Sequence, residues 1–210
     1  MATILIIVTV LVVATLAYWL VLRPWHARWG ATAEEAAKPL PGDDIAAQAN
    51  MVSTRAVTIR AAADKVWPWL VQMGQGRGGM YSYERLENLI GCDIHNTDRI
   101  LPEFQHLEPG DVIRLGPEGY PFYRVAAIEP GRVLVLRPGD PKTKEPGPGS
   151  WALVLEERKD GSTRLLARQR LLYRPTAGNF LLWRVVTEPI SFVMEQKMLR
   201  TIRQLAEESQ

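Results

Sequence analysis

The sequence predicts a protein of the α+β class, in which an antiparallel sheet is covered by one long C-terminal helix and is preceded by a single transmembrane helix. Three observations predict this arrangement. Short runs of β-branched and aromatic residues, separated by Pro-Gly and Asp-Gly turns, occupy residues 110–173. An amphipathic helical pattern follows them. An uncharged apolar segment opens the chain.

The composition is that of a globular protein with enough residues for one well-buried core: 210 residues, of which 47% are hydrophobic and 23% charged. A single cysteine excludes a disulfide-stapled scaffold. The net charge of +2 gives no support to a nucleic-acid partner, and basic and aromatic residues are not interleaved on any predicted strand. The mean hydropathy of −0.09 conceals an apolar N-terminus.

The N-terminal segment Ala2–Leu22 contains no charged side chain. As a helix it would be roughly 30 Å long, which matches the hydrocarbon core of a bilayer. Arg23 and Pro24 are expected to end this helix. Trp19 and Trp25 lie where interfacial aromatic residues anchor a span. A cleaved signal peptide is the alternative, but no basic region precedes the apolar run.

The charges beside this segment predict its orientation. Arg23, His26 and Arg28 follow the apolar run, whereas only the α-amino group precedes it. Cationic residues favour the cytoplasmic side, and the lone Cys92 needs no oxidising compartment. We therefore expect a single-pass protein of the cell membrane with its soluble part in the cytoplasm.

The sequence divides into three predicted parts, which are a membrane anchor at residues 2–22, a juxtamembrane connector at 23–53 and one folded domain at 54–208. In the connector, Thr32 and Glu35 have the spacing of a capping box, which predicts a short helix. A turn cluster with Asp43 and Asp44 follows it. We expect these carboxylates to form a cap rather than a metal site.

The folded domain is predicted to open with one strand and two helices. Thr54–Arg60 alternates as a strand does, and Ala61–Met73 has helical spacing. Because a proline suits only the first turn of a helix, Pro68 predicts that this helix starts near Asp64. A second short helix is expected over Tyr83–Ile90.

Five further strands are predicted in meander order, with the clearest hairpin turn at Lys159–Ser162. They cover Asp111–Leu115, Tyr120–Ile128, Arg132–Arg137, Trp151–Glu157 and Thr163–Tyr173. The chain then returns to helix at Glu188-Pro189, since proline suits the first helical position. One apolar stripe of this helix is expected to cover the sheet, made of Ile190, Met194, Met198, Ile202 and Leu205.

A set of short segments spread over the predicted domain carries a family resemblance: Thr54–Arg60, Val66–Gly79, Tyr81–Tyr83, Leu86–Asn88, Asp93–Asn96 and Pro109–Val112. In these segments the chain resembles bacterial membrane-anchored proteins of the SRPBCC superfamily, the START/Bet v1-like proteins that include polyketide cyclases and lipid-transfer proteins. The resemblance covers about residues 40 to 208 and implies the helix-grip fold. It implies no single activity, because the superfamily contains binding proteins, carriers and enzymes.

The helix-grip fold implies a cavity between the curved sheet and the C-terminal helix, with room for an apolar ligand. Met194 and Met198 are adaptable residues suited to the wall of such a cavity. The sequence leaves open whether the interior is hollow, since an apolar stripe on a helix is also compatible with a filled core.

The densest group of polar and aromatic residues outside the loops is expected near the entrance of this cavity. Its candidates for acid–base catalysis are His95, Tyr83 and Glu103, although no spacing fixes a partner for the histidine. The alternative is structural, with His95 capping a turn. The candidates for ligand contact are Trp67, Tyr81, Tyr83, His95, Arg99, Met194 and Met198.

Three further patterns have competing interpretations. Gly74–Gly79 matches the dinucleotide motif G-x-G-x-x-G, but no strand precedes it, so a flexible link between two helices is expected. Arg164, Arg168 and Arg170 share one strand face: either they face solvent, which is the preferred interpretation, or Arg168 and Arg170 reach an anionic head group in the cavity. Phe180–Val186 either belongs to the core, the preferred interpretation, or rests on the membrane.

The function predicted from the sequence is that of a membrane-anchored protein that binds a hydrophobic or amphipathic, lipid-like small molecule. No metal or cofactor is expected, since the three histidines have no ligand spacing. Two alternatives stay open: a cyclase or dehydratase-type enzyme that uses the same cavity, and a membrane-tethered interaction module with a filled core. The expected partners are the bilayer and the small molecule, without nucleic acid.

Overall fold

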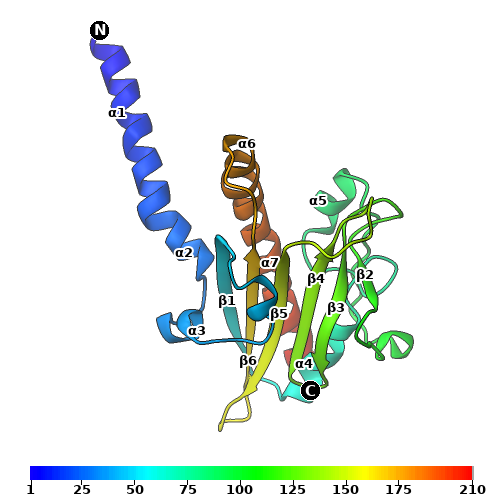
Figure 1. The fold of residues 1–210 in the computed structure, drawn as a ribbon. Coiled ribbons are helices and arrows are strands. Elements are labelled where there is room, and N and C mark those ends of the chain that lie inside the picture. The colour runs from blue at the N-terminus through cyan, green and yellow to red at the C-terminus, as the bar shows by residue number, and fades with distance from the viewer. Residues whose placement is uncertain (210) are drawn as a thin grey trace.

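The computed structural model describes residues 1–209 and shows a curved antiparallel sheet with a long helix across it (Figure 1). The sheet has six strands in the order β1-β6-β5-β4-β3-β2. These are β1 (Met51–Ile59), β2 (Val112–Arg114), β3 (Phe122–Glu129), β4 (Val133–Gly139), β5 (Gly149–Glu157) and β6 (Thr163–Leu171). The helices are α1 (Ala2–Ala17), α2 (Arg23–Ala27), α3 (Ala33–Ala37), α4 (Ala63–Val71), α5 (Glu84–Leu89), α6 (Ala177–Phe180) and α7 (Glu188–Glu208). Shorter turns of helix are η1 (Tyr18–Leu22), η2 (Asp44–Ala46), η3 (Pro102–Phe104) and η4 (Leu181–Thr187).

Strands β2 to β6 form a meander of antiparallel pairs, and β1 completes the sheet by pairing with β6. The hairpin predicted at Lys159–Ser162 joins β5 to β6, and there the Arg158 N–H donates to the carbonyl of Ser162 over 2.8 Å. Helix α7 lies across one face of the sheet, with Met198 and Ile202 buried in the core beneath it. The predicted α+β class and the helix-grip arrangement are confirmed.

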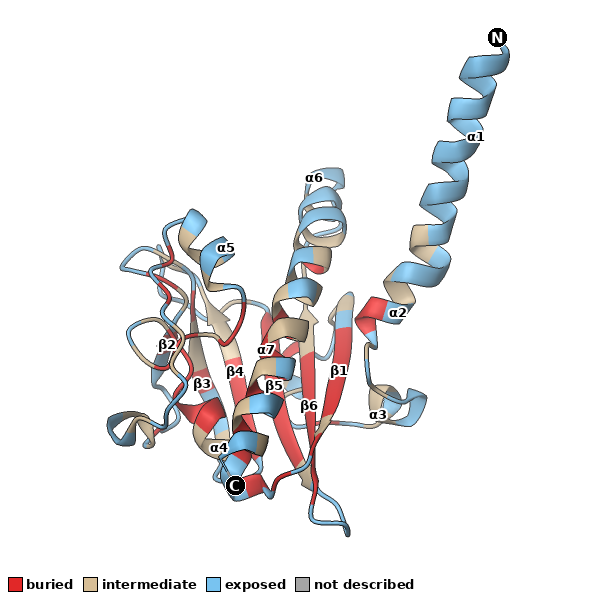
Figure 2. Ribbon diagram, turned by 180° about the vertical axis from the view of Figure 1, so that it is seen from behind, coloured by how far each residue is buried: buried red, intermediate tan, exposed pale blue. Residues whose placement is uncertain are grey.

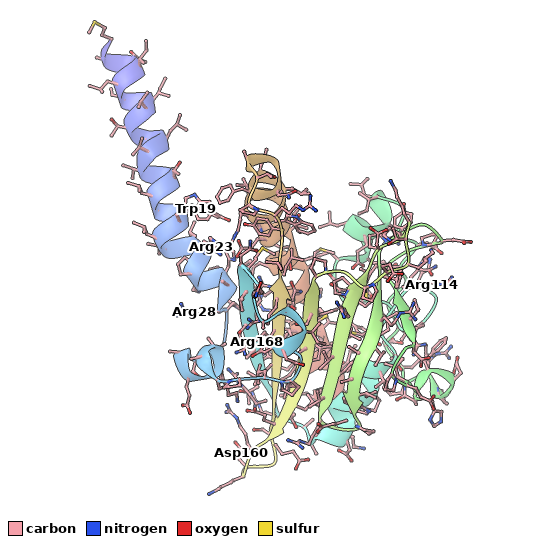
Figure 3. The ribbon with its side chains drawn as sticks, in the orientation of Figure 1. Trp19, Arg23, Arg28, Arg114, Asp160 and Arg168 are labelled. Atoms are coloured by element: carbon pink, nitrogen blue, oxygen red, sulfur yellow. The ribbon has the colours of Figure 1, made fainter. Side chains whose placement is uncertain are left out.

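The opposite face of the sheet is covered by residues of the connector, which are folded onto the domain (Figure 3). The predicted capping box at the start of α3 is present. The buried Arg164 donates to Glu35 over 2.7 and 2.8 Å, and the buried Arg168 donates to Asp43 over 2.8 Å. The solvent-facing interpretation is therefore wrong for both arginines, and the head-group interpretation is wrong for Arg168, because connector carboxylates hold these side chains away from solvent and from the interior. The apolar cluster beneath the connector contains Leu40, Ala56, Val133, Val135, Ala152, Val154 and Leu166.

Two helices are longer than predicted because each passes through a proline. The first is continuous over Ala2–Ala27, beyond its expected end at Leu22. The last is continuous from Ala177 into α7, although it was expected to start at Glu188-Pro189. A π-helical turn, η1 or η4, ends just ahead of each proline. Such a wider turn accommodates a residue that has no N–H to donate.

Two predictions in the first half of the domain were also wrong. Helix α4 starts at Ala63, next to the predicted start near Asp64, but Pro68 is its sixth residue and lies in its interior rather than in its first turn. The glycine-rich segment is not a flexible link, because Gly74 and Gly79 pair with each other through hydrogen bonds of 2.9 and 3.1 Å. A side chain at Gly79 would approach the Asn96 Oδ1 atom to 2.4 Å, so close packing requires glycine there.

The outer side of the last helix is exposed (Figure 2), and over its first turns the exposed residues are mostly apolar. Phe180–Val186 is not part of the core, since Leu181 is 58% exposed and Val185 45% exposed. Ile190, assigned to the stripe that covers the sheet, is 57% exposed. These side chains lie on the side of the helix that is turned away from the sheet.

Candidate cavity between the sheet and the last helix

The candidate site is a cavity of about 390 Å³ between the sheet and the last helix. Small-molecule sites usually measure about 300–1,000 Å³. Five strands contribute to its wall, mostly at the ends nearest to α6, and η4 and α7 close the other side. The wall residues are Met51, Ser53, Arg55, Leu115, Pro121, Phe122, Tyr123, Pro138, Gly139, Ser150, Trp151, Gln169, Arg170, Leu171, Trp183, Thr187, Glu188 and Ser191. The protein is thus an α+β protein of helix-grip arrangement with a hollow interior.

A buried polar network lies on the wall where β1 faces α7. The Arg55 guanidinium pairs with the Glu195 carboxylate at 2.5 Å, and the two side chains are 1% and 3% exposed. Gln169 donates to the same carboxylate over 2.9 Å, and the Ser191 hydroxyl donates to Gln169 over 2.9 Å. Each charge therefore has a partner, which an ion pair taken out of water requires.

Two aromatic donors stand beside this network. The rings of Tyr123 on β3 and Trp151 on β5 have their centroids 5.3 Å apart. Burial, together with the nearby Glu195, raises the pKa of Tyr123 to about 12, so its hydroxyl stays protonated at neutral pH. The Trp151 indole N–H is buried without a hydrogen-bond partner among the described residues. Since buried donors are seldom left unpaired, this wall is suited to a ligand that carries an acceptor atom.

An ion-pair cluster connects the first helix to the mouth of the cavity. Arg23 donates to Glu188 over 3.1 and 3.2 Å, and Glu188 lines the cavity. Arg184 lies 3.5 Å from the same carboxylate and donates to the Tyr173 hydroxyl over 3.0 Å. The Glu188 side chain is 2% exposed, so two cations compensate a buried charge. In Figure 3, Arg23 is drawn on the lower part of the first helix, below Trp19.

A smaller cavity of about 140 Å³ adjoins the first and shares part of its wall. Met194 and Met198, predicted from the sequence as wall residues, line this smaller cavity. Glu87 lines it too, and one of its carboxylate oxygens is buried without a partner among the described residues. Burial, with Glu84 nearby, raises the pKa of Glu87 to about 7.

The aromatic residues predicted for ligand contact lie elsewhere. Tyr81 is fully buried in the core, where burial raises its pKa to about 12. Trp67 on α4 is half-buried and packs against the same core. Tyr83 is 42% exposed. The neighbouring Met80 and Ser82 line the smaller cavity instead, so this segment does reach the interior but through other side chains than expected.

The remaining candidates lie on the surface. The His95 side chain is 75% exposed, with its Nε2 atom 3.1 Å from Asp93 and its Nδ1 atom 3.6 Å from Glu84. Arg99 and Glu103 are exposed as well. The structure therefore does not assemble His95, Tyr83 and Glu103 on the wall of either cavity.

Buried amides account for much of the polar character of this segment. The Gln72 side chain, which is fully buried, donates to the Tyr81 hydroxyl over 2.6 Å and to the carbonyl of Arg99 over 3.0 Å. The Asn88 side chain binds both the N–H and the carbonyl of Ile94 at 2.7 Å. These side chains satisfy the backbone of long loops, as buried loop segments require.

Sequence reasoning missed the principal wall residues, among them Arg55, Tyr123 and Trp151. Strand periodicity alone gives two faces and does not say which of them is hollow. One signal was present in the last helix, where Glu188, Ser191 and Glu195 recur at helical spacing between apolar residues. A polar stripe on the side of a helix that faces a sheet indicates a polar interior.

Comparisons with known proteins give a likeness in shape only. No protein-family model and no curated protein matches the sequence. Protein MLL2253 from Mesorhizobium loti is similar in structure, with 15% identity, a TM-score of 0.44, and 76% of this chain and 99% of that chain covered. Protein CV1439 from Chromobacterium violaceum has 12% identity and a TM-score of 0.46, with 74% and 96% covered. Ara h 8.0201 has 11% identity and a TM-score of 0.40, with 75% and 98% covered.

Proposed function

We propose that the protein is a membrane-anchored binding protein of the SRPBCC type, which holds a hydrophobic or amphipathic small molecule in the larger cavity. The observation that carries this proposal is the cavity itself, about 390 Å³ of space between the sheet and the last helix. A filled core, the interaction-module alternative, does not agree with such a space. The aromatic donors on the wall favour a ligand that combines an apolar body with one hydrogen-bond acceptor.

Binding is favoured over catalysis by the state of the charges on the wall. Every charged wall residue of the larger cavity, within residues 1–209, is ion-paired: Arg55, Arg170 and Glu188. A general acid or base must exchange its proton with a ligand, whereas Arg55 is held by Glu195, Arg170 by Asp43, and Glu188 by Arg23.

The first helix supports the membrane part of the proposal. Ala2–Ala27 is long and apolar enough to cross a bilayer, and none of the residues of α1 is buried. Helix α1 therefore has no protein surface to cover its side chains, and lipid would cover them. Arg23 and Arg28, which follow the apolar segment, favour a cytoplasmic position of the domain, and we include that orientation in the proposal.

Native mass spectrometry of the full-length protein, purified in a mild detergent, tests the binding function. We expect the wild-type protein to retain an apolar small molecule. The variant Ser191→Phe, which adds a ring at a residue shared by both cavities, should lose at least nine-tenths of it. The control Arg203→Phe places the same ring on the exposed side of the same helix. An empty wild-type protein, or equal retention by Ser191→Phe and the control, would contradict the proposal.

A further inference from the structure

An exposed apolar face runs along the outer side of α6, η4 and the start of α7. Its members are Phe180, Leu181, Leu182, Val185, Val186 and Ile190, each of them at least 45% exposed. The opposite side of the same helix carries Trp183 and Thr187, which line the larger cavity. A contiguous apolar surface on a soluble domain marks a contact with another apolar phase.

The first helix fixes the depth of this face. The Trp19 ring stacks on the Phe180 ring with centroids 5.4 Å apart, and Arg23 pairs with Glu188 at 3.1 Å. At a rise of about 1.5 Å per residue, Phe180 and Glu188 lie about 12 Å apart along their own helix, and their partners Trp19 and Arg23 lie about 6 Å apart along the first helix. Since Trp19 belongs to the apolar segment Ala2–Leu22, the exposed face begins at the depth of that segment.

We propose that α6 and η4 form a second membrane-contacting element, which inserts into the boundary between lipid head groups and acyl chains beside α1. The inference rests on the anchoring role proposed for α1. Amphipathic helices lie about 5–10 Å deep in this boundary, which agrees with the level of Phe180 next to Trp19. Arg184 lies within these apolar turns, but its side chain is only 15% exposed and pairs with Glu188 at 3.5 Å, so its charge is directed toward the domain and not toward the exposed face.

A second group of exposed apolar residues lies at the same end of the molecule. In Figures 1 and 2, α5 and α6 both project from the end of the domain on which α1 rises. Leu86, Leu89 and Ile90, in or next to α5, are between 53% and 80% exposed. These residues and the face on α6 and η4 can rest on one plane of lipid, with α1 crossing beside them.

This placement sets the mouth of the cavity at the lipid surface. Trp183 and Thr187 lie on the cavity side of the helix whose other side meets the lipid. An amphipathic ligand would then pass from the bilayer into the cavity along η4, without crossing bulk water. The exposed apolar side chains of η4 stabilise nothing within the domain, and contact with lipid explains why they are apolar.

Depth measurement by nitroxide labelling tests the inference on the full-length protein in phosphatidylcholine vesicles. In a Cys92→Ala background, single labels are placed at Leu182→Cys and Val186→Cys, with Val12→Cys as the span control and Lys159→Cys, in the distal hairpin, as the aqueous control. We expect the labels at 182 and 186 to be more accessible to oxygen than to an aqueous nickel chelate, as at 12. The label at 159 should show the reverse.

The outcomes separate this inference from the proposed function. Labels at 182 and 186 that behave as the label at 159 does, while the label at 12 is in lipid, would overturn the inference and leave the anchor and the cavity in place. Aqueous labels at all four positions would overturn both the anchor and the inference. Binding in the cavity is read separately, by the mass spectrometry described above.

Discussion

Arg55 on the first strand and Glu195 on the last helix form an ion pair of 2.5 Å that is almost completely shielded from water. It joins the two ends of the domain, because the two residues lie 140 positions apart in the chain. The Arg55 guanidinium also lies over the Phe192 ring, 5.4 Å from its centroid, and donates to the carbonyl of His26 over 2.9 Å. One arginine thus connects the first helix, the sheet and the last helix beside the cavity.

Removal of one partner of this pair should destabilise the fold strongly. Glu195→Ala leaves the Arg55 charge buried and unpaired, and we expect a loss of about 3–5 kcal/mol in the free energy of unfolding. Denaturant titration of the detergent-solubilised protein measures it. The double variant Arg55→Met with Glu195→Leu should recover most of the loss. A cost below about 1 kcal/mol for Glu195→Ala would show that the pair is solvated.

The connector should detach from the sheet when Arg168 on β6 is removed. Arg168 donates to the carbonyls of Glu35, Ala36 and Lys38 as well as to Asp43. For Arg168→Ala we expect faster proteolytic cleavage within residues 30–47, because these carbonyls lose their buried donor. Limited proteolysis followed by mass spectrometry locates the cuts. The control Arg174→Ala, at an exposed residue, should be cleaved at the wild-type rate, and equal rates for both variants would contradict this account.

Acid should weaken the same contact between connector and sheet. Hydrogen bonds from Arg164 lower the pKa of Glu35 from 4.5 to about 2. The unfolded chain therefore takes up this proton before the folded protein does, so the contribution of Glu35 is complete at neutral pH and is lost as pH falls from about 4.5 toward 2. Thermal unfolding between pH 7 and pH 3 checks this. Glu35→Gln should show a smaller acid-induced decrease in Tm, and an identical decrease would refute the assignment.

Glu87 should have the opposite effect on stability. Its pKa is raised from 4.5 to about 7, first by burial and then by Glu84. The folded protein keeps this proton after the unfolded chain has lost it, so stability falls as pH rises from about 4.5 to 7 and is constant above. Glu87→Gln should remove this loss and give a higher Tm than the wild type at pH 8. Glu118→Gln, at an exposed residue, serves as the control, and a lower Tm for Glu87→Gln at pH 8 would contradict the prediction.

Most of the domain fold could be predicted from local patterns. The strand runs, the hairpin at Lys159–Ser162 and the amphipathic last helix all follow from periodicity and turn residues. The pairing of β1 with β6 could not be predicted in this way, since it joins residues far apart in the chain. Pro24 was expected to end the first helix and Pro189 to begin the last one, whereas both helices continue through these prolines after a π-helical turn.

The site was harder to predict than the fold for a physical reason. Tyr81 and His95 lie in the most polar segment of the chain, yet Tyr81 packs in the core and His95 lies on the surface. The cavity wall instead takes two or three residues from each of five strands, among them Tyr123 on β3 and Trp151 on β5. Only the three-dimensional curvature of the sheet shows which inward-facing side chains leave space between them.

Photo-crosslinking tests most directly whether a lipid from the bilayer enters the cavity. A diazirine-bearing fatty acid is incorporated into vesicles that contain the full-length protein, activated by light, and the modified residues are located by mass spectrometry. We predict adducts on the cavity wall, at Tyr123, Trp151 or Leu171, in addition to α1, and loss of the wall adducts in Ser191→Phe. Adducts confined to α1 and the outer surface would contradict a lipid-accessible cavity.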